Sequence, residues 1–464
     1  MTDFSQLLVA DRGQTARPVH LVDKKSFEDW IKKRPADDRA LLESQKFDGK
    51  TANACALLPR GNDFEVVSAV ETTERLSAWC IANLAEKLPE GTYRIASGEP
   101  GDAALGWLLG QHRFDEYRSK KEEERGPRIL LTGDAARIDT FVREAQATAL
   151  VRDLVNRPAV DLGPAELEQA VRDCANELGA KVRVTGGKDL VEGYPLIAAV
   201  GRAAAESRAP RLIELEWGRP GHPRVAIIDK GVCFDSGGLE LKPASGMRLM
   251  KKDMGGAAHA LALARLIIAE KLGVHHHLLI PAVENSVSGS ALRPGDIIRS
   301  RNGLFVEIDN TDAEVRLILA DALTRAREDD PELIIDFATL TGAARVALGP
   351  DLPACFCNRD DLAAQILEGA AKAGDPVWRM PLWAAYDEML KSDIADLANA
   401  SNSPMAGSIV AAMFLKRFVP DEIQWAHFDT YAWRDTAKPG RPRGGEALGL
   451  RAMFALLRDR YLHA

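Results

Sequence analysis

The chain lacks the features that mark disulfide-bonded and membrane-spanning proteins. Its 464 residues include only six cysteines, and no two of them form the C-x-x-C pair of a zinc knuckle. No apolar run approaches the roughly 18 residues of a membrane span, and the first residues show no basic segment followed by an apolar one. We therefore expect free buried thiols, no membrane association and a cytoplasmic location.

The chain also lacks a basic excess and the short motifs of two common catalytic classes. Its 60 Lys and Arg residues are outnumbered by 68 Asp and Glu, and this formal net charge of −8 argues against broad nonspecific binding of nucleic acid. This net charge does not exclude a local basic patch. No G-x-S-x-G motif supplies a serine nucleophile, and the Gly-rich GMRLMKKDMGG lacks the P-loop pattern that binds phosphates.

The length predicts two domains, because the chain exceeds the roughly 250–300 residues at which single cores stop growing. Residues 1–135, with a strand at Thr92–Gly98 and apolar residues at helical spacing after it, are predicted to form a small α/β domain. A linking helix is predicted over 136–159, and a larger domain over 160–464. The charge run Arg118–Arg125 is predicted to lie at the surface near the end of the first domain.

The larger domain alternates apolar strand candidates with helical stretches. The candidate strands are Leu196–Val200, Arg224–Asp229, Leu278–Val283 and Leu333–Leu340, and the helices include Ala257–Lys271 and Val315–Arg327. Continuous apolar strands separated by helices predict an α/β fold with a mixed, largely parallel sheet covered by helices on both faces. In such a sheet, ligands bind at the carboxyl ends of the strands.

Several acids and two lysines stand next to these predicted strands and helices, in Gly-rich or turn-forming segments. They are Asp235, Asp253, Asp312 and Glu314, with Lys230 and Lys242. Since residues far apart in sequence converge at the carboxyl edge of a sheet, we expect one cluster. Carboxylate oxygens favour Mg, Mn or Zn, and such a set suits two ions about 3.5–4 Å apart.

The order of several motifs resembles a known family. FDSGG followed by LKP, then MKKDMGGAA, PAVEN, RPGD, NTDAEVRL and ATLTGAA, is similar to the leucyl (cytosol) aminopeptidase family of two-metal exopeptidases, from about Val151 to the C-terminus. The resemblance implies an enzyme that removes N-terminal residues from peptides, with leucine and similar apolar residues preferred. It also implies Mn or Zn as the two ions, with Mg as a further candidate, and a homohexamer.

The resemblance assigns a role to each candidate residue. Asp235 and Glu314 bridge the two ions, Lys230 and Asp253 complete one metal site, and Asp312 completes the other. A lysine ligand must be neutral, and nearby dications favour this by depressing its pKa. Lys242 stabilises the oxyanion, and Arg316 holds a bicarbonate that relays a proton. The implied substrate-binding residues are Met250, Thr339, Leu340 and Gly342.

Two positions depart from the resembled family, which has glycine at both. Asp229 precedes Lys230 and, because strand residues alternate, points away from it. Val315 follows Glu314, and if the backbone there needs a positive φ, a β-branched residue costs on the order of 1–3 kcal/mol. Its Cβ also hinders a close approach of the backbone to bicarbonate. We therefore predict a weakened bicarbonate site and slow turnover.

Two further function classes stay open. The departures at Asp229 and Val315 favour a catalytically weak homologue that serves as a binding or scaffolding assembly, DNA binding included. The second class is an amidase that depends on a serine or a lysine, and it predicts activity that survives a chelator. The intact ligand set favours the metallopeptidase.

Several single residues also suit structural roles. Asp312 before a helix is a good N-cap, and Met250 suits an apolar core equally well. The run His275–His277 looks like a metal motif, yet in an extended segment only its first and third residues share a face. A structural interpretation is favoured for two other pairs, His427 with Asp429 and Cys355 with Cys357.

Overall fold

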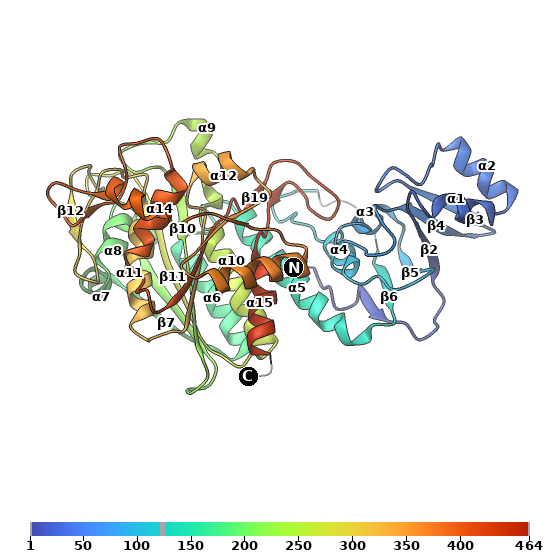
Figure 1. Cartoon of the computed structure of the whole chain (residues 1–464), viewed down its shortest axis with the longest axis horizontal. Helices are drawn as coiled ribbons and strands as arrows, with labels where there is room; N and C mark the ends of the chain where they lie inside the picture. Colours follow the sequence, from blue (N-terminus) through green and yellow to red (C-terminus); the bar gives the residue numbers. More distant parts are fainter. Residues whose placement is uncertain (1, 121–125, 463–464) are drawn as a thin grey trace. The chain divides into compact units, whose positions relative to one another are not determined.

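The computed structural model describes residues 2–120 and 126–462, and its contacts divide the chain into two compact units (Figure 1). The first unit contains Met1–Ala149 and Asp435–Arg443, and the second contains the rest. The boundaries predicted at residues 135 and 160 bracket the division, which falls inside helix α5 (Ile138–Asn156). Of the charge run predicted at the surface, residues 118–120 are exposed and 121–125 lie outside the described residues.

The first unit is built on a six-stranded sheet in the order β1-β6-β5-β2-β4-β3, parallel except for the β3–β4 pair. Its strands are β1 (Leu8–Ala10), β2 (Arg17–Val22), β3 (Cys55–Arg60), β4 (Asp63–Ala69), β5 (Gly91–Ile95) and β6 (Arg128–Thr132). Its helical segments are α1 (Phe27–Lys32), α2 (Ala36–Ser44), α3 (Ala82–Lys87), α4 (Ala103–Leu109), the 3₁₀ turn η1 (Ala135–Arg137) and most of α5. The predicted small α/β domain is confirmed.

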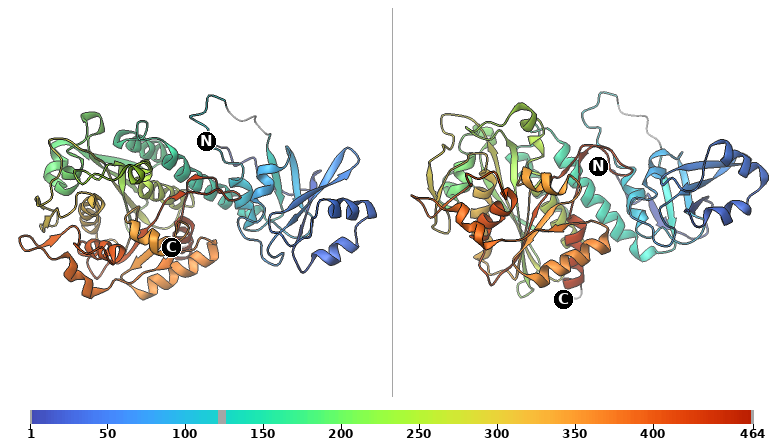
Figure 2. Two further views of the ribbon diagram at one scale, coloured as in Figure 1. Left: turned by 90° about the horizontal axis from the view of Figure 1, so that it is seen from above. Right: turned by 45° about the horizontal axis from the view of Figure 1, so that its top comes forward.

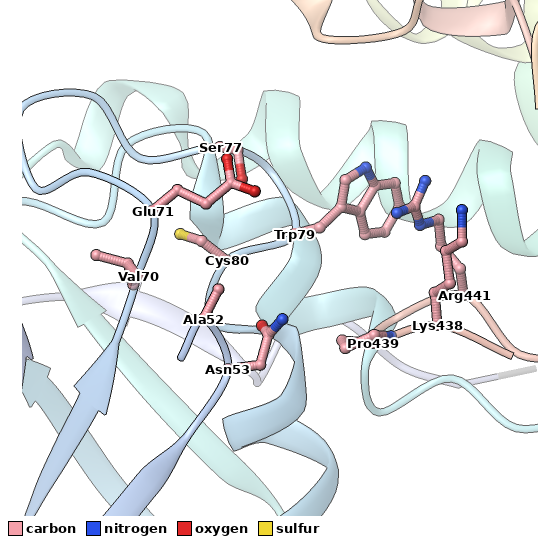
Figure 3. Close-up of a pocket in the computed structure, with 10 residues that line it drawn as sticks. All are labelled: Ala52, Asn53, Val70, Glu71, Ser77, Trp79, Cys80, Lys438, Pro439 and Arg441. Atoms are coloured by element: carbon pink, nitrogen blue, oxygen red, sulfur yellow. The ribbon is translucent and has the colours of Figure 1, made fainter. Parts of the chain in front are cut away.

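The segment Asp435–Arg443 returns to the first unit as a short hairpin, which the sequence did not indicate. Lys438 and Arg441 pair across it, and Gly440 N donates to Glu86 Oε1 at 2.6 Å. The Arg441 guanidinium lies 4.7 Å from the centroid of the Trp79 ring. The hairpin and the residues around Trp79 line a cavity of about 450 Å³ (Figure 3). The first unit is therefore completed by residues from the far end of the chain.

The second unit is built on a nine-stranded mixed sheet. Eight strands follow the order β16-β15-β18-β14-β9-β11-β8-β7, and β10 pairs with β11 in addition. Strands β9, β10, β11, β14 and β18 are mutually parallel, whereas β7, β8 and β15 introduce antiparallel pairs. The strands are β7 (Lys181–Gly186), β8 (Arg211–Trp217), β9 (Arg224–Asp229), β10 (Gly231–Asp235), β11 (His275–Asn285), β14 (Leu333–Ala338), β15 (Ala354–Cys357), β16 (Trp378–Arg379) and β18 (Gln424–Asp429).

Helices cover both faces of this sheet (Figure 2). Helices α8, α11 and α14 pack on one face around a large apolar cluster, and α6, α10 and α15 pack on the other. The helices are α6 (Pro164–Leu178), α7 (Gly187–Gly193), α8 (Pro195–Gly201), α9 (Ala244–Met247), α10 (Gly255–Ala269), α11 (Glu314–Arg327), α12 (Gly342–Leu348), α13 (Asp360–Ala373), α14 (Gly407–Lys416) and α15 (Leu450–Tyr461). The predicted mixed, helix-covered sheet is confirmed.

Short elements complete the second unit. They are the 3₁₀ segments η2 (Glu206–Arg208), η3 (Met250–Lys252) and η4 (Ala384–Leu390), the small sheet of β12 (Ile297–Arg299), β13 (Phe305–Glu307) and β17 (Leu397–Ala398), and the ribbon of β19 (Trp433–Arg434) with β20 (Gly444–Gly445). Among residues 2–120 and 126–462, no helix has the length and apolar character that crossing a membrane requires.

One predicted strand is wrong. Leu196–Val200 forms helix α8, and Pro195 occupies its first turn, where its fixed φ suits a helix and its missing N–H is not needed. All five residues are buried, and a short run that is apolar on every side has no periodicity to separate a strand from a buried helix. The strands predicted at Arg224–Asp229, Leu278–Val283 and Leu333–Leu340 correspond to β9, part of β11 and β14.

The strain considered for Val315 is absent. Val315 is the second residue of helix α11 and does not have a positive φ. Its side chain is 2% exposed and belongs to the apolar cluster under α8 and α11. The concern about positive φ was wrong because the helix begins at Glu314, so the backbone at Val315 is already helical.

Candidate metal centre

The predicted site residues of the second unit gather at the carboxyl ends of the parallel strands. Lys230 follows β9, Asp235 ends β10 and Thr339 follows β14. Asp253 follows η3, and Glu314 opens α11. Five segments that are remote in sequence thus meet at one edge of the sheet, as the parallel strands predicted.

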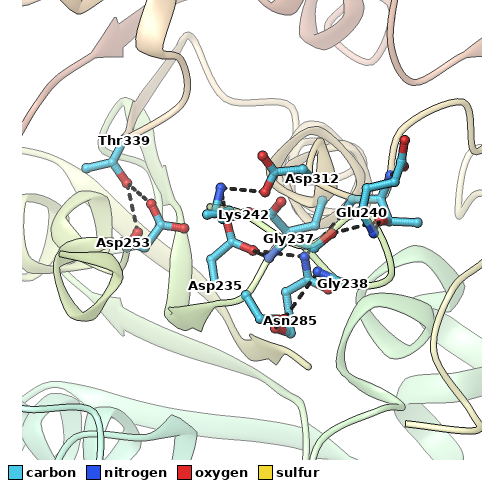
Figure 4. Close-up of polar contacts among 12 residues, drawn as sticks. Asp235, Gly237, Gly238, Glu240, Lys242, Asp253, Asn285, Asp312 and Thr339 are labelled. Carbon is cyan, nitrogen blue, oxygen red and sulfur yellow. Dashed lines mark hydrogen bonds and ion pairs between the residues drawn. The ribbon is translucent and has the colours of Figure 1, made fainter. Parts of the chain in front are cut away.

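A tight glycine turn places Asp235 (Figure 4). Gly237 has φ +88°, and a Cβ there would lie 2.5 Å from the Glu240 carbonyl oxygen, so only glycine fits this turn. Asp235 Oδ1 accepts hydrogen bonds from Gly237 N at 2.8 Å and from Asn285 Nδ2 at 2.9 Å. The other carboxylate oxygen of Asp235, Oδ2, forms an ion pair with Lys242.

Three carboxylates form the centre of the cluster. One oxygen each from Asp235, Asp312 and Glu314 lies within 4.8 Å of the other two. Glu314 is fully buried, and neither of its oxygens has a hydrogen-bond partner among the described residues. Burial and the charge of Asp235 raise the pKa of Glu314 well above its usual range and the pKa of Asp312 to about 6. The Lys230 ammonium, 3.5 Å from Glu314 Oε1, does not offset this rise, so an ionised Glu314 needs further positive charge beside it.

Lys230 lies on the inner side of the cluster and is 2% exposed. Its Nζ lies 2.5 Å from Asp253 Oδ2 and 3.5 Å from Glu314 Oε1, and it donates to the Thr339 carbonyl oxygen at 2.9 Å. Thr339 Oγ1 in turn donates to Asp253 Oδ1 at 2.9 Å. Burial lowers the pKa of Lys230, but the surrounding carboxylates outweigh burial and raise it.

Lys242 lies on the more accessible side. Its Nζ is 2.8 Å from Asp235 Oδ2 and also forms an ion pair with Asp312 Oδ1. Burial lowers the pKa of Lys242, but the charges of Asp235 and Glu314 raise it by more than burial lowers it. The side chain therefore stays an ammonium. The side chain of Asp312 keeps 34% of its surface exposed, which makes it the most accessible of the acids.

The remaining predicted residues lie around this cluster. Arg316, in the first turn of α11, donates to the Asn399 carbonyl oxygen at 2.7 Å, and burial lowers its pKa to about 10. Met250 begins η3 and is half-buried, and Leu340 packs against the large apolar cluster. Gly342 begins α12 and is exposed, with nothing within 4 Å of where a Cβ would stand.

Three residues that the sequence did not single out as site residues hold the cluster in place. Asn285 Nδ2 donates to Asp235 and to the Thr311 carbonyl oxygen, so it joins two ligand-bearing loops. Asn399 binds the loop before α11. Asp429 accepts hydrogen bonds from Leu340 N and Thr341 N, both at 3.1 Å, and so fixes the loop after β14. The motif PAVEN contains Asn285, and Asp429 was considered above only with His427, in a structural role. Asn399 carried no signal in the sequence.

The structural interpretation of the other polar candidates agrees with the contacts. His277 lies between Glu214 and Asp329, at 3.2 Å from each, with Arg325 beside both acids. His427 Nδ1 contacts Asp336 Oδ1 at 2.5 Å. The sulfurs of Cys355 and Cys357 lie 3.6 Å apart, and both residues are buried.

Asp229 points away from the cluster, as strand alternation predicted. Its Oδ1 accepts a hydrogen bond from Phe337 N at 3.0 Å, on the neighbouring strand β14. Burial and the nearby Asp336 raise the pKa of Asp229 well above its usual range.

The donor set fits divalent cations that prefer oxygen ligands. Four acids converge there, one of them buried without hydrogen-bond donors, and an amine stands among them. A helix-covered mixed sheet with such a cluster at its carboxyl edge has the architecture of a metal-dependent hydrolase. Residues 149–454 match the catalytic domain of the cytosol aminopeptidase family, and residues 17–128 match the M17 aminopeptidase N-terminal domain. The chain belongs to the cytosol aminopeptidase family and is a peptidase of the leucyl aminopeptidase type.

Solved structures and curated relatives agree. The cytosol aminopeptidase from Coxiella burnetii is 43% identical with a TM-score of 0.92, covering 98% of this chain and 99% of that one. The bottromycin maturation enzyme BotP in complex with Mn is 32% identical with a TM-score of 0.85, covering 96% of this chain and all of that one. A probable cytosol aminopeptidase from Syntrophotalea carbinolica is 42% identical over 368 residues, which span 76% of this chain and 73% of the relative.

Proposed function

We propose that the protein is an aminopeptidase that uses two divalent ions to remove N-terminal residues from peptides, with leucine and similar apolar residues preferred. The observation that carries the proposal is Glu314, a buried carboxylate without hydrogen-bond donors, which shares a 4.8 Å cluster with Asp235 and Asp312. Bound divalent ions would activate water and neutralise the charge that develops on the peptide carbonyl. Mn and Zn are the proposed ions, with Mg as a further candidate, and the Mn complex of the similar BotP supports this choice.

The cluster divides into two groups of proposed ligands. Asp235 and Glu314 are proposed to contact both ions, as the family resemblance implies, and both belong to the three-acid cluster. Lys230 and Asp253, 2.5 Å apart on the inner side, are proposed to complete one site, and Asp312 the other. Lys230 has to lose its proton to serve as a ligand, and two dications would reverse the field that now raises its pKa.

Lys242 and Arg316 are the proposed cationic participants in the reaction. Lys242 stays charged and reaches the cluster from its accessible side, so we assign it to the oxyanion that forms on the scissile carbonyl. Arg316 is proposed to hold a bicarbonate that relays a proton to the leaving amine. The Val315 side chain lies in the apolar core and its backbone is helical, which supports an anion beside Arg316. Met250, Thr339, Leu340 and Gly342 are proposed to line the substrate site.

The protein is further proposed to act in the cytoplasm as a homohexamer. The names of its relatives support the location. Large apolar side chains that are exposed in the single chain support assembly, among them Trp378, Trp383, Ile394 and Met405. Light scattering on the purified protein measures the mass, and a monomer would contradict the hexamer.

A chelator experiment tests the proposed reaction. Protein stripped with a chelator should not hydrolyse a leucine chromogenic amide, and added Mn²⁺ or Zn²⁺ should restore hydrolysis with two ions bound per chain by mass spectrometry. Activity that survives the chelator would favour serine- or lysine-dependent amidase chemistry. Two bound ions without hydrolysis would favour a catalytically weak homologue that serves as a binding assembly.

A further inference from the structure

Asn399 lies next to the loop that carries the acids of α11, although about 85 residues of sequence separate them. It follows β17, and its backbone N donates to the Glu307 carbonyl oxygen at 2.9 Å, which extends the pairing of β17 with β13. Strand β13 leads directly into the loop at residues 308–313. Asn399 is fully buried.

The Asn399 side chain uses its full hydrogen-bonding capacity on that loop. Its Oδ1 accepts from Asp309 N at 2.9 Å and from Asn310 N at 3.1 Å. Its Nδ2 donates to the carbonyl oxygens of Asn310 at 2.7 Å and Ala313 at 3.3 Å. An amide offers two donors and two acceptor positions, and all four are satisfied here by one loop. The partners span the turn on both sides of Asp312.

The backbone carbonyl of Asn399 contacts a further site residue, Arg316. Its carbonyl oxygen accepts from an Nη of Arg316 at 2.7 Å. One residue therefore holds the turn that presents Asp312, the start of the helix that presents Glu314, and one end of the Arg316 guanidinium. Loops are more mobile than the elements they connect, so a loop that carries site residues needs contacts that fix it.

We propose that Asn399 is a positioning residue for the peptidase reaction, which sets the places of Asp312, Glu314 and Arg316 together. The inference rests on the proposed two-metal function. The side chain of Asn399 is fully engaged by the loop, so the proposed role is to position other residues. Its loss leaves four backbone groups of the loop, one buried and three part-buried, without their partner, so the loop has to shift to find others. Residues that orient metal ligands typically change affinity or activity by about 10- to 100-fold when replaced.

Asn358 provides a matched control in the same unit. Its Nδ2 donates to the Ile423 carbonyl oxygen at 2.8 Å and its Oδ1 accepts from Trp425 N at 2.8 Å, so it also joins two backbone segments through its amide. It lies beyond the end of β15, among residues that carry none of the proposed ligands. Asn358→Ala therefore reports the cost of losing a structural amide alone.

The test compares Asn399→Ala, Asn399→Asp and Asn358→Ala with the parent. Thermal unfolding, kcat and KM for a leucine amide, and Mn²⁺ binding to stripped protein by calorimetry are measured. Asn399→Ala should lower kcat and weaken Mn²⁺ binding, each by about 10- to 100-fold, with little change in KM. Asn399→Asp keeps both acceptors but faces two carbonyl oxygens with a carboxylate, so it should also lose activity. Asn358→Ala should lower the unfolding temperature and keep parental kcat and Mn²⁺ affinity.

Several outcomes would overturn the inference. Parental kcat and Mn²⁺ affinity in Asn399→Ala would do so, as would an equal loss in Asn358→Ala. If Asn399→Ala does not fold, Asn399→Asp decides by the same two measurements. A parent without chelator-sensitive hydrolysis would refute the proposed function instead, and calorimetry would still show whether Asn399 governs Mn²⁺ binding.

Discussion

The Lys242 ammonium lies 2.8 Å from Asp235 Oδ2, whereas the Lys230 ammonium lies 2.5 Å from Asp253 Oδ2. The two lysines differ in access, since the side chain of Lys242 is 15% exposed and that of Lys230 is 2% exposed. The buried lysine suits the interior of a metal centre, and the more accessible one suits contact with a substrate. This difference leads to separate predictions for the two.

Lys242→Ala should keep both ions and lose about 10²- to 10³-fold in kcat, because a charged amine stabilises a developing oxyanion and does not bind dications. Metal content by mass spectrometry and kcat for a leucine amide are the measurements. Loss of metal in this variant would place Lys242 among the ligands.

Lys230→Arg should lose an ion and nearly all activity, because a guanidinium does not deprotonate to become a ligand. Lys242→Arg is the matched control, since it keeps a positive charge at the accessible position and should retain two ions. If Lys230→Arg binds two ions as tightly as the parent, Lys230 is not a ligand.

Glu314→Ala should abolish activity and lower the metal content, because Glu314 is proposed to contact both ions. Glu328→Gln, just beyond the other end of α11 where Glu328 pairs with Arg301, should leave both properties unchanged. Two tightly bound ions with near-normal turnover in Glu314→Ala would contradict the assignment.

Leucine and methionine should be preferred at the N-terminus of the substrate, since Met250 offers an apolar, adaptable wall. The preference should be modest, because one methylene changes discrimination by about 1–3 kcal/mol. A panel of aminoacyl amides measures it as kcat/KM, and clearly faster cleavage of the lysine or glutamate amide would refute the expectation.

Val315→Gly should destabilise the protein by about 2–4 kcal/mol, because it empties a core position and puts glycine inside a helix. Val315→Ala separates the two effects, since it removes apolar volume but keeps a good helix former. Urea unfolding measures the stability of both variants. In addition, kcat is measured at several bicarbonate concentrations. A faster Val315→Gly that responds to bicarbonate would restore the steric explanation drawn from the sequence.

Acid should destabilise the second unit through His276, which is fully buried in β11. Burial lowers the pKa of His276 from 6.5 to about 3. Below pH 6.5 the unfolded chain therefore binds a proton at this histidine and the folded chain does not. The free energy of unfolding falls as the pH drops from 6.5 toward 3. Each pH unit in that window lowers the free energy of unfolding by about 1.4 kcal/mol. His276→Gln should show a smaller loss between pH 7.5 and 5.5 in urea unfolding, whereas His275→Gln should follow the parent.

The sequence by itself indicated which acids gather at the centre and most of the strands that position them. Asp235, Asp253, Asp312 and Glu314 stand beside strands or at a helix start, and parallel strands bring their carboxyl ends together whatever the loops do. Glycine turns such as the one at Gly237 depend on neighbouring residues only, so the local sequence predicts them. The longer apolar runs likewise predicted the central strands β9, β11 and β14.

Only the tertiary structure decided the rest. Leu196–Val200 is buried on every side, so periodicity could not separate helix from strand, and packing selected the helix. The backbone strain considered for Val315 does not arise, because the helix begins one residue before it. Asn399 and the hairpin Asp435–Arg443 act on segments far away in sequence, and an asparagine or a short loop carries no local sign of its distant partner. Contacts of this kind exist only once the chain has folded, because they join backbone groups that the sequence does not distinguish.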